Sequence, residues 1–92
     1  MDKIRAHVII SGIVQGVMFR YSAKKEADKL NLTGYVKNLV NNELEIVVEG
    51  KNNIVKKLIY WAQSGPEFAK IDNCVINYLP YQNEFDEFLI IY

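Results

Sequence analysis

The segment from Gly12 to Arg20 has the residue types and spacing needed to bind a phosphate group. Its sequence is Gly-Ile-Val-Gln-Gly-Val-Met-Phe-Arg, and it lies between a predicted strand and a predicted helix. Backbone N–H groups at the start of a helix lack intrahelical partners, and the helix dipole adds partial positive charge there. Gly16 would let the backbone approach an anion closely. Arg20 would add a planar fork that can hold two phosphate oxygens. The segment therefore predicts a local oxyanion site.

The same segment lacks the features of two common nucleotide-binding loops. It has neither the Gly-Lys-Ser/Thr ending of a Walker loop nor the three glycines of the dinucleotide fingerprint. An ordinary turn followed by a solvated Arg20 is the competing interpretation. The loop alone leaves both interpretations open.

Two regular elements must hold this loop in place. Ahead of it, Ala6, Val8 and Ile10 alternate with polar residues, which predicts a strand over residues 4–13. Behind it, apolar residues spaced three or four apart predict an amphipathic helix with the buried face Phe19, Ala23, Ala27 and Leu30. Asn31 tolerates the left-handed conformation that ends a helix.

A predicted hairpin follows. Residues 35–38 and 43–49 have strand character, and Asn41-Asn42 between them is a good turn, since asparagine tolerates positive φ. In the second strand, apolar residues alternate with an acidic face that is expected to lie in solvent: Glu43, Glu45 and Glu49.

The remaining elements complete the predicted fold. A second amphipathic helix stops at Gly65-Pro66, and its apolar positions are Ile54, Leu58, Trp61 and Ala62. Residues 71–81 and 88–92 are two more predicted strands. The order β-α-β-β-α-β plus a C-terminal strand predicts an α+β, ferredoxin-like split βαβ sandwich, with two helices on one face of an antiparallel sheet. We expect one domain over residues 3–92, because the chain is too short for two.

Composition narrows the class of protein. Eleven basic residues balance eleven acidic ones, which argues against binding nucleic acid or a membrane surface through net positive charge. Cys74 is the single cysteine, so no intrachain disulfide can form, and a reducing compartment is favoured. No run of roughly 20 apolar residues is available for a membrane span. We expect a cytoplasmic monomer with no nucleic-acid or membrane partner.

Two segments resemble the signatures of the acylphosphatase family. Residues 12–20 match one signature as Gly-x-Val-Gln-Gly-Val-x-Phe-Arg. Residues 34–38, Gly-Tyr-Val-Lys-Asn, followed by Glu43-x-Glu45-x-Val47 and then Glu49-Gly50, are similar to the other. The resemblance implies an enzyme without metal or cofactor. Such an enzyme hydrolyses the carboxyl–phosphate bond of small acyl phosphates to a carboxylate and inorganic phosphate.

The resemblance also implies which residues form the site. Arg20 stands at the family's phosphate-gripping arginine and Asn38 at its water-positioning asparagine. The phosphate cradle corresponds to the backbone amides of Gln15, Gly16, Val17, Met18 and Phe19. Three positions depart from the family's pattern, which favours glycine at the first two and arginine at the third: Asn31, Asn42 and Ile91. The two asparagines are tolerable, because Asn is the next-best residue at positive φ.

The chemistry of an acyl phosphate agrees with these residue types. An asparagine amide cannot abstract a proton near neutral pH, so Asn38 could only orient a water molecule. The leaving carboxylate is already a stable anion, with a carboxyl pKa of roughly 4, so no general acid is needed. The phosphate can accept the proton of the water. Positioning and charge stabilisation then remain for the protein.

Two other functions stay open at this point. A binding module could dock acyl or carbamoyl phosphate for a larger partner, although it would not need Asn38 to position water. A small RNA-binding domain would stack bases on aromatic residues of its sheet, but the sequence lacks a basic patch and the aromatic run of that class. His7, Cys74 and Trp61 are expected to be structural, since His7 has no second histidine and Cys74 no second cysteine to act with.

Overall fold

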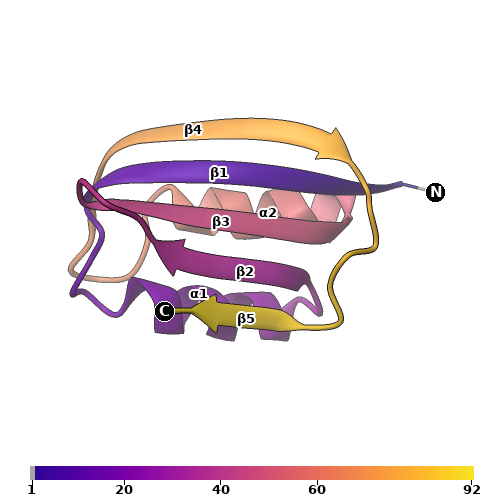
Figure 1. Ribbon diagram of the computed structural model, residues 1–92, viewed down its shortest axis with the longest axis horizontal. Coiled ribbons are helices and arrows are strands. Elements are labelled where there is room, and N and C mark those ends of the chain that lie inside the picture. Colours follow the sequence, from indigo (N-terminus) through magenta and orange to yellow (C-terminus); the bar gives the residue numbers. More distant parts are fainter. Residues whose placement is uncertain (1) are drawn as a thin grey trace.

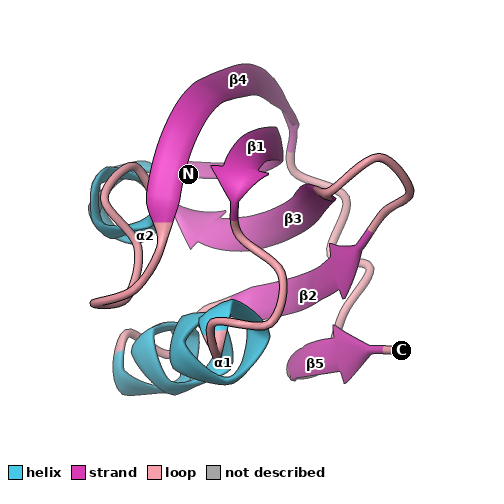
Figure 2. Ribbon diagram, turned by 90° about the vertical axis from the view of Figure 1, so that its left-hand side faces the viewer, coloured by secondary structure: helices cyan, strands magenta, loops and turns pink. Residues whose placement is uncertain are grey.

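Five strands and two helices make up the computed structural model, which describes residues 2–92. They follow in the order β1 (Lys3–Ile13), α1 (Phe19–Lys29), β2 (Thr33–Asn38), β3 (Glu43–Lys51), α2 (Asn52–Ala62), β4 (Lys70–Pro80) and β5 (Phe88–Ile91). The strands form one sheet in the order β4-β1-β3-β2-β5 (Figure 1), and Figure 2 shows both helices on the same face of it. Neither helix in this part of the chain is long and apolar enough to cross a membrane. The predicted element order and ferredoxin-like arrangement are confirmed.

One edge of the sheet corrects the expected antiparallel arrangement. β1 pairs antiparallel with β3 and β4, and β2 pairs antiparallel with β3. β5, however, runs parallel to β2, with Gly34 opposite Phe88. Because β4 and β5 lie on opposite edges, the connection formed by residues 81–87 crosses the sheet at one end (Figure 1). β5 therefore starts at the end where β2 starts, and the sheet is mixed.

The core lies between the helices and the face of the sheet that they cover. Alternation along β1 turns Ala6, Val8 and Ile10 inward, and all three are fully buried. The helices supply the buried residues Phe19, Ala23, Ala27, Val55, Leu58, Ile59 and Ala62. Phe19 meets Trp61 edge to face, with ring centres 5.5 Å apart. Full burial of a Phe side chain contributes about 1.5–3 kcal/mol, so Phe19 anchors the start of α1 firmly.

Asparagines close the two turns where the sequence predicts positive φ. Asn31 has φ 56° after α1, and Asn41 and Asn42 have φ 62° and 60° between β2 and β3. Asn is among the few non-glycine residues that enter this region readily, because its short polar side chain can hydrogen-bond locally. Two of the three departures from the family's pattern are thus accommodated by the backbone.

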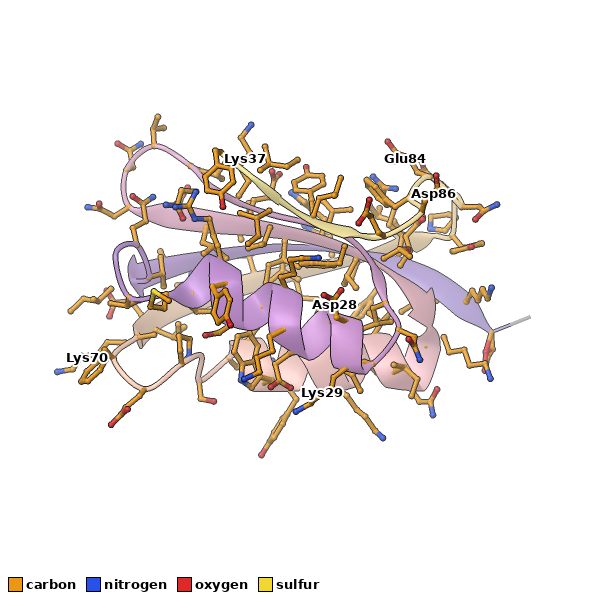
Figure 3. The ribbon with its side chains drawn as sticks, turned by 90° about the horizontal axis from the view of Figure 1, so that it is seen from below. Asp28, Lys29, Lys37, Lys70, Glu84 and Asp86 are labelled. Carbon is orange, nitrogen blue, oxygen red and sulfur yellow. The ribbon has the colours of Figure 1, made fainter. Side chains whose placement is uncertain are left out.

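Glu49 corrects the expectation of a solvated acidic face on β3. Its side chain is buried beneath the connection formed by residues 81–87, on the face of the sheet away from the helices. The backbone N–H groups of Gln82 and Glu84 donate to its carboxylate at 2.7 and 3.0 Å, and Arg5 Nη1 lies 3.4 Å away. Figure 3 labels Glu84 on this connection, at the end of the sheet away from Lys37. The alternation pattern gave the correct face, but it carried no information about the segment that covers it.

Candidate active site

The end of the sheet where β1 leads into α1 is also the end where β2 and β5 finish (Figure 1). A pocket of about 280 Å³ lies there. Its lining residues are Val14, Gly16, Met18, Phe19, Arg20, Tyr21, Asn38, Ile90 and Tyr92. Arg20 and Asn38, which the sequence placed in two separate motifs, therefore share one pocket. The predicted cradle residues Gln15 and Val17 do not line it. Val17 packs against the core, and the Gln15 side chain turns toward the β2–β3 turn.

The loop before α1 owes its shape to two residues with positive φ. Gly16 has φ 76° and Met18 has φ 64°. A Cβ built on Gly16 would meet nothing within 4 Å, so glycine is favoured there by conformation rather than by lack of space. Successive N–H groups in such turns can form a concave site for an anion. The left-handed conformation of Met18 could not be inferred from its residue type, because non-glycine residues seldom adopt it.

The N-terminus of α1 is open to an anion. Met18 occupies the N-cap position without a capping side-chain hydrogen bond, and the first turn holds no acidic residue. The N–H groups at this end therefore keep their capacity to donate, and the dipole adds partial positive charge.

Arg20 supplies the full charge of the pocket. It is half-buried in the first turn of α1, and its Cζ lies 4.9 Å from the centre of the Tyr92 ring. Within residues 2–92, no carboxylate lies at ion-pair distance from it. Its charge is thus left for a bound anion.

Asn38 ends β2 with an unsatisfied acceptor. Its Oδ1 is buried and has no hydrogen-bond partner within the described part of the chain. A buried polar atom left without a partner costs about 1–3 kcal/mol, so this oxygen is suited to accept a hydrogen bond from a ligand or water molecule.

Gln15 ties the loop to the β2–β3 turn. Its Nε2 donates to Leu39 O at 2.7 Å and to Glu43 O at 2.9 Å. The sequence pointed only to the backbone amide of Gln15. Nothing in the sequence signals the side-chain contacts, because both acceptors are backbone carbonyls whose position depends on the fold.

A second polar cluster lies outside the pocket, on the face of the sheet away from the helices. His7 Nε2 is 2.7 Å from Glu45 Oε2, and the Tyr35 hydroxyl donates to Glu45 Oε1 at 3.0 Å. Burial raises the pKa of Tyr35, and the hydrogen bond and charge of Glu45 raise it further. None of the three residues lines the pocket.

Cys74 and Trp61 also lie outside the pocket. Both pack against the core, and burial raises the pKa of the Cys74 thiol. Among residues 2–92, no three His, Cys, Asp or Glu side chains come together as a metal site requires.

Comparison with known proteins identifies the family of this chain. The family model described as acylphosphatase matches residues 6–90. The chain belongs to the acylphosphatase family. An acylphosphatase from Geobacter sulfurreducens is 39% identical over 90 residues, covering 98% of this chain and 99% of that protein. One from Aeropyrum pernix is 41% identical over 90 residues, covering 97% and 89%.

A solved structure agrees with these relatives. The crystal structure of acylphosphatase from Bacillus subtilis superposes with a TM-score of 0.92 at 32% identity, covering 97% of this chain and 99% of that one. The activity of the chain is accordingly that of an acylphosphatase: it hydrolyses small acyl phosphates and releases inorganic phosphate.

Proposed function

We propose that Arg20 and the backbone amides of the loop residues that line the pocket, Gly16, Met18 and Phe19, bind the phosphoryl group, and that Asn38 positions the attacking water. One observation carries this proposal: Arg20 and Asn38 line the same pocket, and the buried Asn38 Oδ1 has no hydrogen-bond partner among residues 2–92. The open N-terminus of α1 and the uncompensated charge of Arg20 support phosphate binding there.

Each residue then has a role that the reaction requires. Arg20 and the amides stabilise charge on the phosphoryl oxygens as the transition state forms. The Asn38 Oδ1 accepts a hydrogen bond from the water and holds its oxygen in line with the P–O bond. The water oxygen bonds to phosphorus, and the P–O bond to the acyl group breaks. Its electron pair leaves with the carboxylate, and a phosphoryl oxygen takes the proton of the water.

The proposal includes a small substrate and a monomeric enzyme. A pocket of about 280 Å³ suits a small acyl phosphate such as acetyl phosphate. We infer a cytoplasmic location, because the single cysteine, Cys74, is a free thiol.

Two variants test the assigned roles. Hydrolysis of a synthetic aromatic acyl phosphate is measured with chelator present, and melting curves are recorded across a phosphate series. Arg20→Ala should lose at least about 3 kcal/mol of transition-state stabilisation, more than a hundredfold in kcat/KM, and should lose stabilisation by phosphate. Asn38→Ala should lose about a hundredfold in kcat, while phosphate still raises its melting temperature.

Matched controls remove a basic side chain and an asparagine side chain outside the pocket. Lys25→Ala on α1 and Asn53→Ala on α2 change exposed residues outside the pocket and should behave as wild type. Near-normal hydrolysis by a folded Arg20→Ala or Asn38→Ala protein would refute the role of that residue. Stabilisation by phosphate without any hydrolysis by the wild type would favour the binding-module alternative.

A further inference from the structure

Gln15 joins the two sides of the pocket, and we propose that it is a positioning residue for Asn38. Its Nε2 donates to Leu39 O and Glu43 O, at 2.7 and 2.9 Å. Within the described residues, these are the only side-chain hydrogen bonds between the loop before α1 and the β2–β3 turn. The inference rests on the proposed role of Asn38.

The position of Asn38 depends on its backbone. Its Oδ1 has no hydrogen-bond partner in residues 2–92, so no protein donor fixes this oxygen. The Asn38 backbone is restrained by pairing with Leu44 in the β2–β3 ladder. The next residue, Leu39, lies outside the sheet, and its carbonyl accepts a hydrogen bond from Gln15. Gln15 therefore restrains the backbone at the point where sheet pairing ends.

Few other contacts restrain this turn. The Leu39 N–H donates to Glu43 O at 2.8 Å, and Gln15 gives the same oxygen a second donor. Val40, within the turn, is 78% exposed, so burial does little to hold it. Because one amide group donates to two carbonyls, it restrains their orientation as well as their distance from the loop.

The placement of Gln15 has a consequence for the reaction. Its backbone belongs to the loop that carries the proposed phosphate cradle, while its side chain holds the strand end that carries Asn38. Gln15 thus links the loop that binds phosphate to the strand end that positions the water. A displacement of about 1 Å in a reacting group can cost about a hundredfold in rate.

Gln15→Met tests the proposal, because methionine has a similar length and no donors. We expect kcat to fall about ten- to a hundredfold with the affinity for inorganic phosphate unchanged. The decisive measurement is the double-mutant cycle with Asn38→Ala. When the Asn38 amide is absent, Gln15→Met should cause no further loss of kcat. Gln63→Met, on an exposed residue after α2, is the matched control and should leave kcat and phosphate affinity unchanged.

Two results would overturn the proposal. An equal fall in phosphate affinity and kcat would mean that Gln15 shapes the cradle and not the water site. If Gln15→Met lowers kcat by the same factor in the Asn38→Ala protein as in wild type, Gln15 acts independently of Asn38. If Gln15→Met does not fold, Gln15→Asn, which is one methylene too short to reach both carbonyls, takes its place in the same cycle. Normal activity of Asn38→Ala alone would instead refute the proposed function.

Discussion

The Arg20 guanidinium lies 4.9 Å from the centre of the Tyr92 ring, within reach of a cation–π contact. Tyr92 is 91% exposed, and such a contact at an exposed site is worth about 0.5–1 kcal/mol. We expect Tyr92→Leu to weaken phosphate binding about two- to fivefold with little change in kcat. The Tyr92 ring holds the Arg20 side chain in place, and we propose no contact between the ring and the bond that breaks. Inhibition by inorganic phosphate measures the effect. Tyr92→Phe keeps the ring and should match wild type, so an equal loss in that variant would contradict a role for the ring.

Glu49 should be important for stability. It is buried and accepts N–H bonds from Gln82 and Glu84. Glu49→Gln replaces one acceptor oxygen with a donor that faces these N–H groups, so we expect a loss of about 1–3 kcal/mol in the free energy of unfolding. Urea denaturation measures the loss. Glu84→Gln changes the exposed partner of Arg5 and should cost less than about 1 kcal/mol. Equal losses of stability in Glu49→Gln and Glu84→Gln would contradict the greater importance of the buried Glu49 carboxylate.

Tyr35 should make stability depend on alkaline pH. Burial, with the hydrogen bond and charge of Glu45, raises its pKa above the model-compound value of 10.0. The folded-state pKa is then higher than the unfolded-state pKa. The neutral hydroxyl therefore contributes stability below about pH 10, and this contribution is lost as the pH rises through the folded-state pKa. Above pH 10 the free energy of unfolding should fall more steeply for wild type than for Tyr35→Phe. Parallel pH profiles from urea denaturation would contradict this expectation.

Asn42 offers a test of the β2–β3 turn. It has φ 60°, and the family's pattern favours glycine at this position. Asn42→Gly should change the free energy of unfolding by less than about 0.5 kcal/mol, because glycine adopts this conformation without strain. Asn42→Ala should cost about 1 kcal/mol, since its Cβ disfavours positive φ and its methyl group cannot hydrogen-bond locally. Thermal melts measure the difference in stability between the two variants. An Asn42→Ala protein as stable as wild type would show that positive φ at this position causes no strain for alanine.

Local patterns in the sequence predict most of the elements. Alternation along β1 and the helical spacing from Phe19 onward depend on neighbours a few residues apart, so they are visible without the fold. The asparagine turns are equally local. Arg20 and Asn38 belong to two separate motifs, and both line one pocket in the structure.

The features that the sequence does not predict depend on segments far apart in the chain. The burial of Glu49 depends on residues 81–87, and the parallel pairing of β5 depends on where that connection delivers the strand. The side-chain bonds of Gln15 depend on two carbonyls of a distant turn. Periodicity identifies the face on which a residue lies, but it does not identify what covers that face.

The parallel pairing of β5 with β2 also bears on how the protein folds. Gly34 meets Phe88 across this edge, so loop-closure entropy opposes its formation and the contact is expected to form slowly. Ile90 and Tyr92, which complete one wall of the pocket, arrive with this strand. During refolding, helical circular dichroism should therefore recover before phosphate binding does. The binding site is completed only when the C-terminal strand β5 has paired with β2.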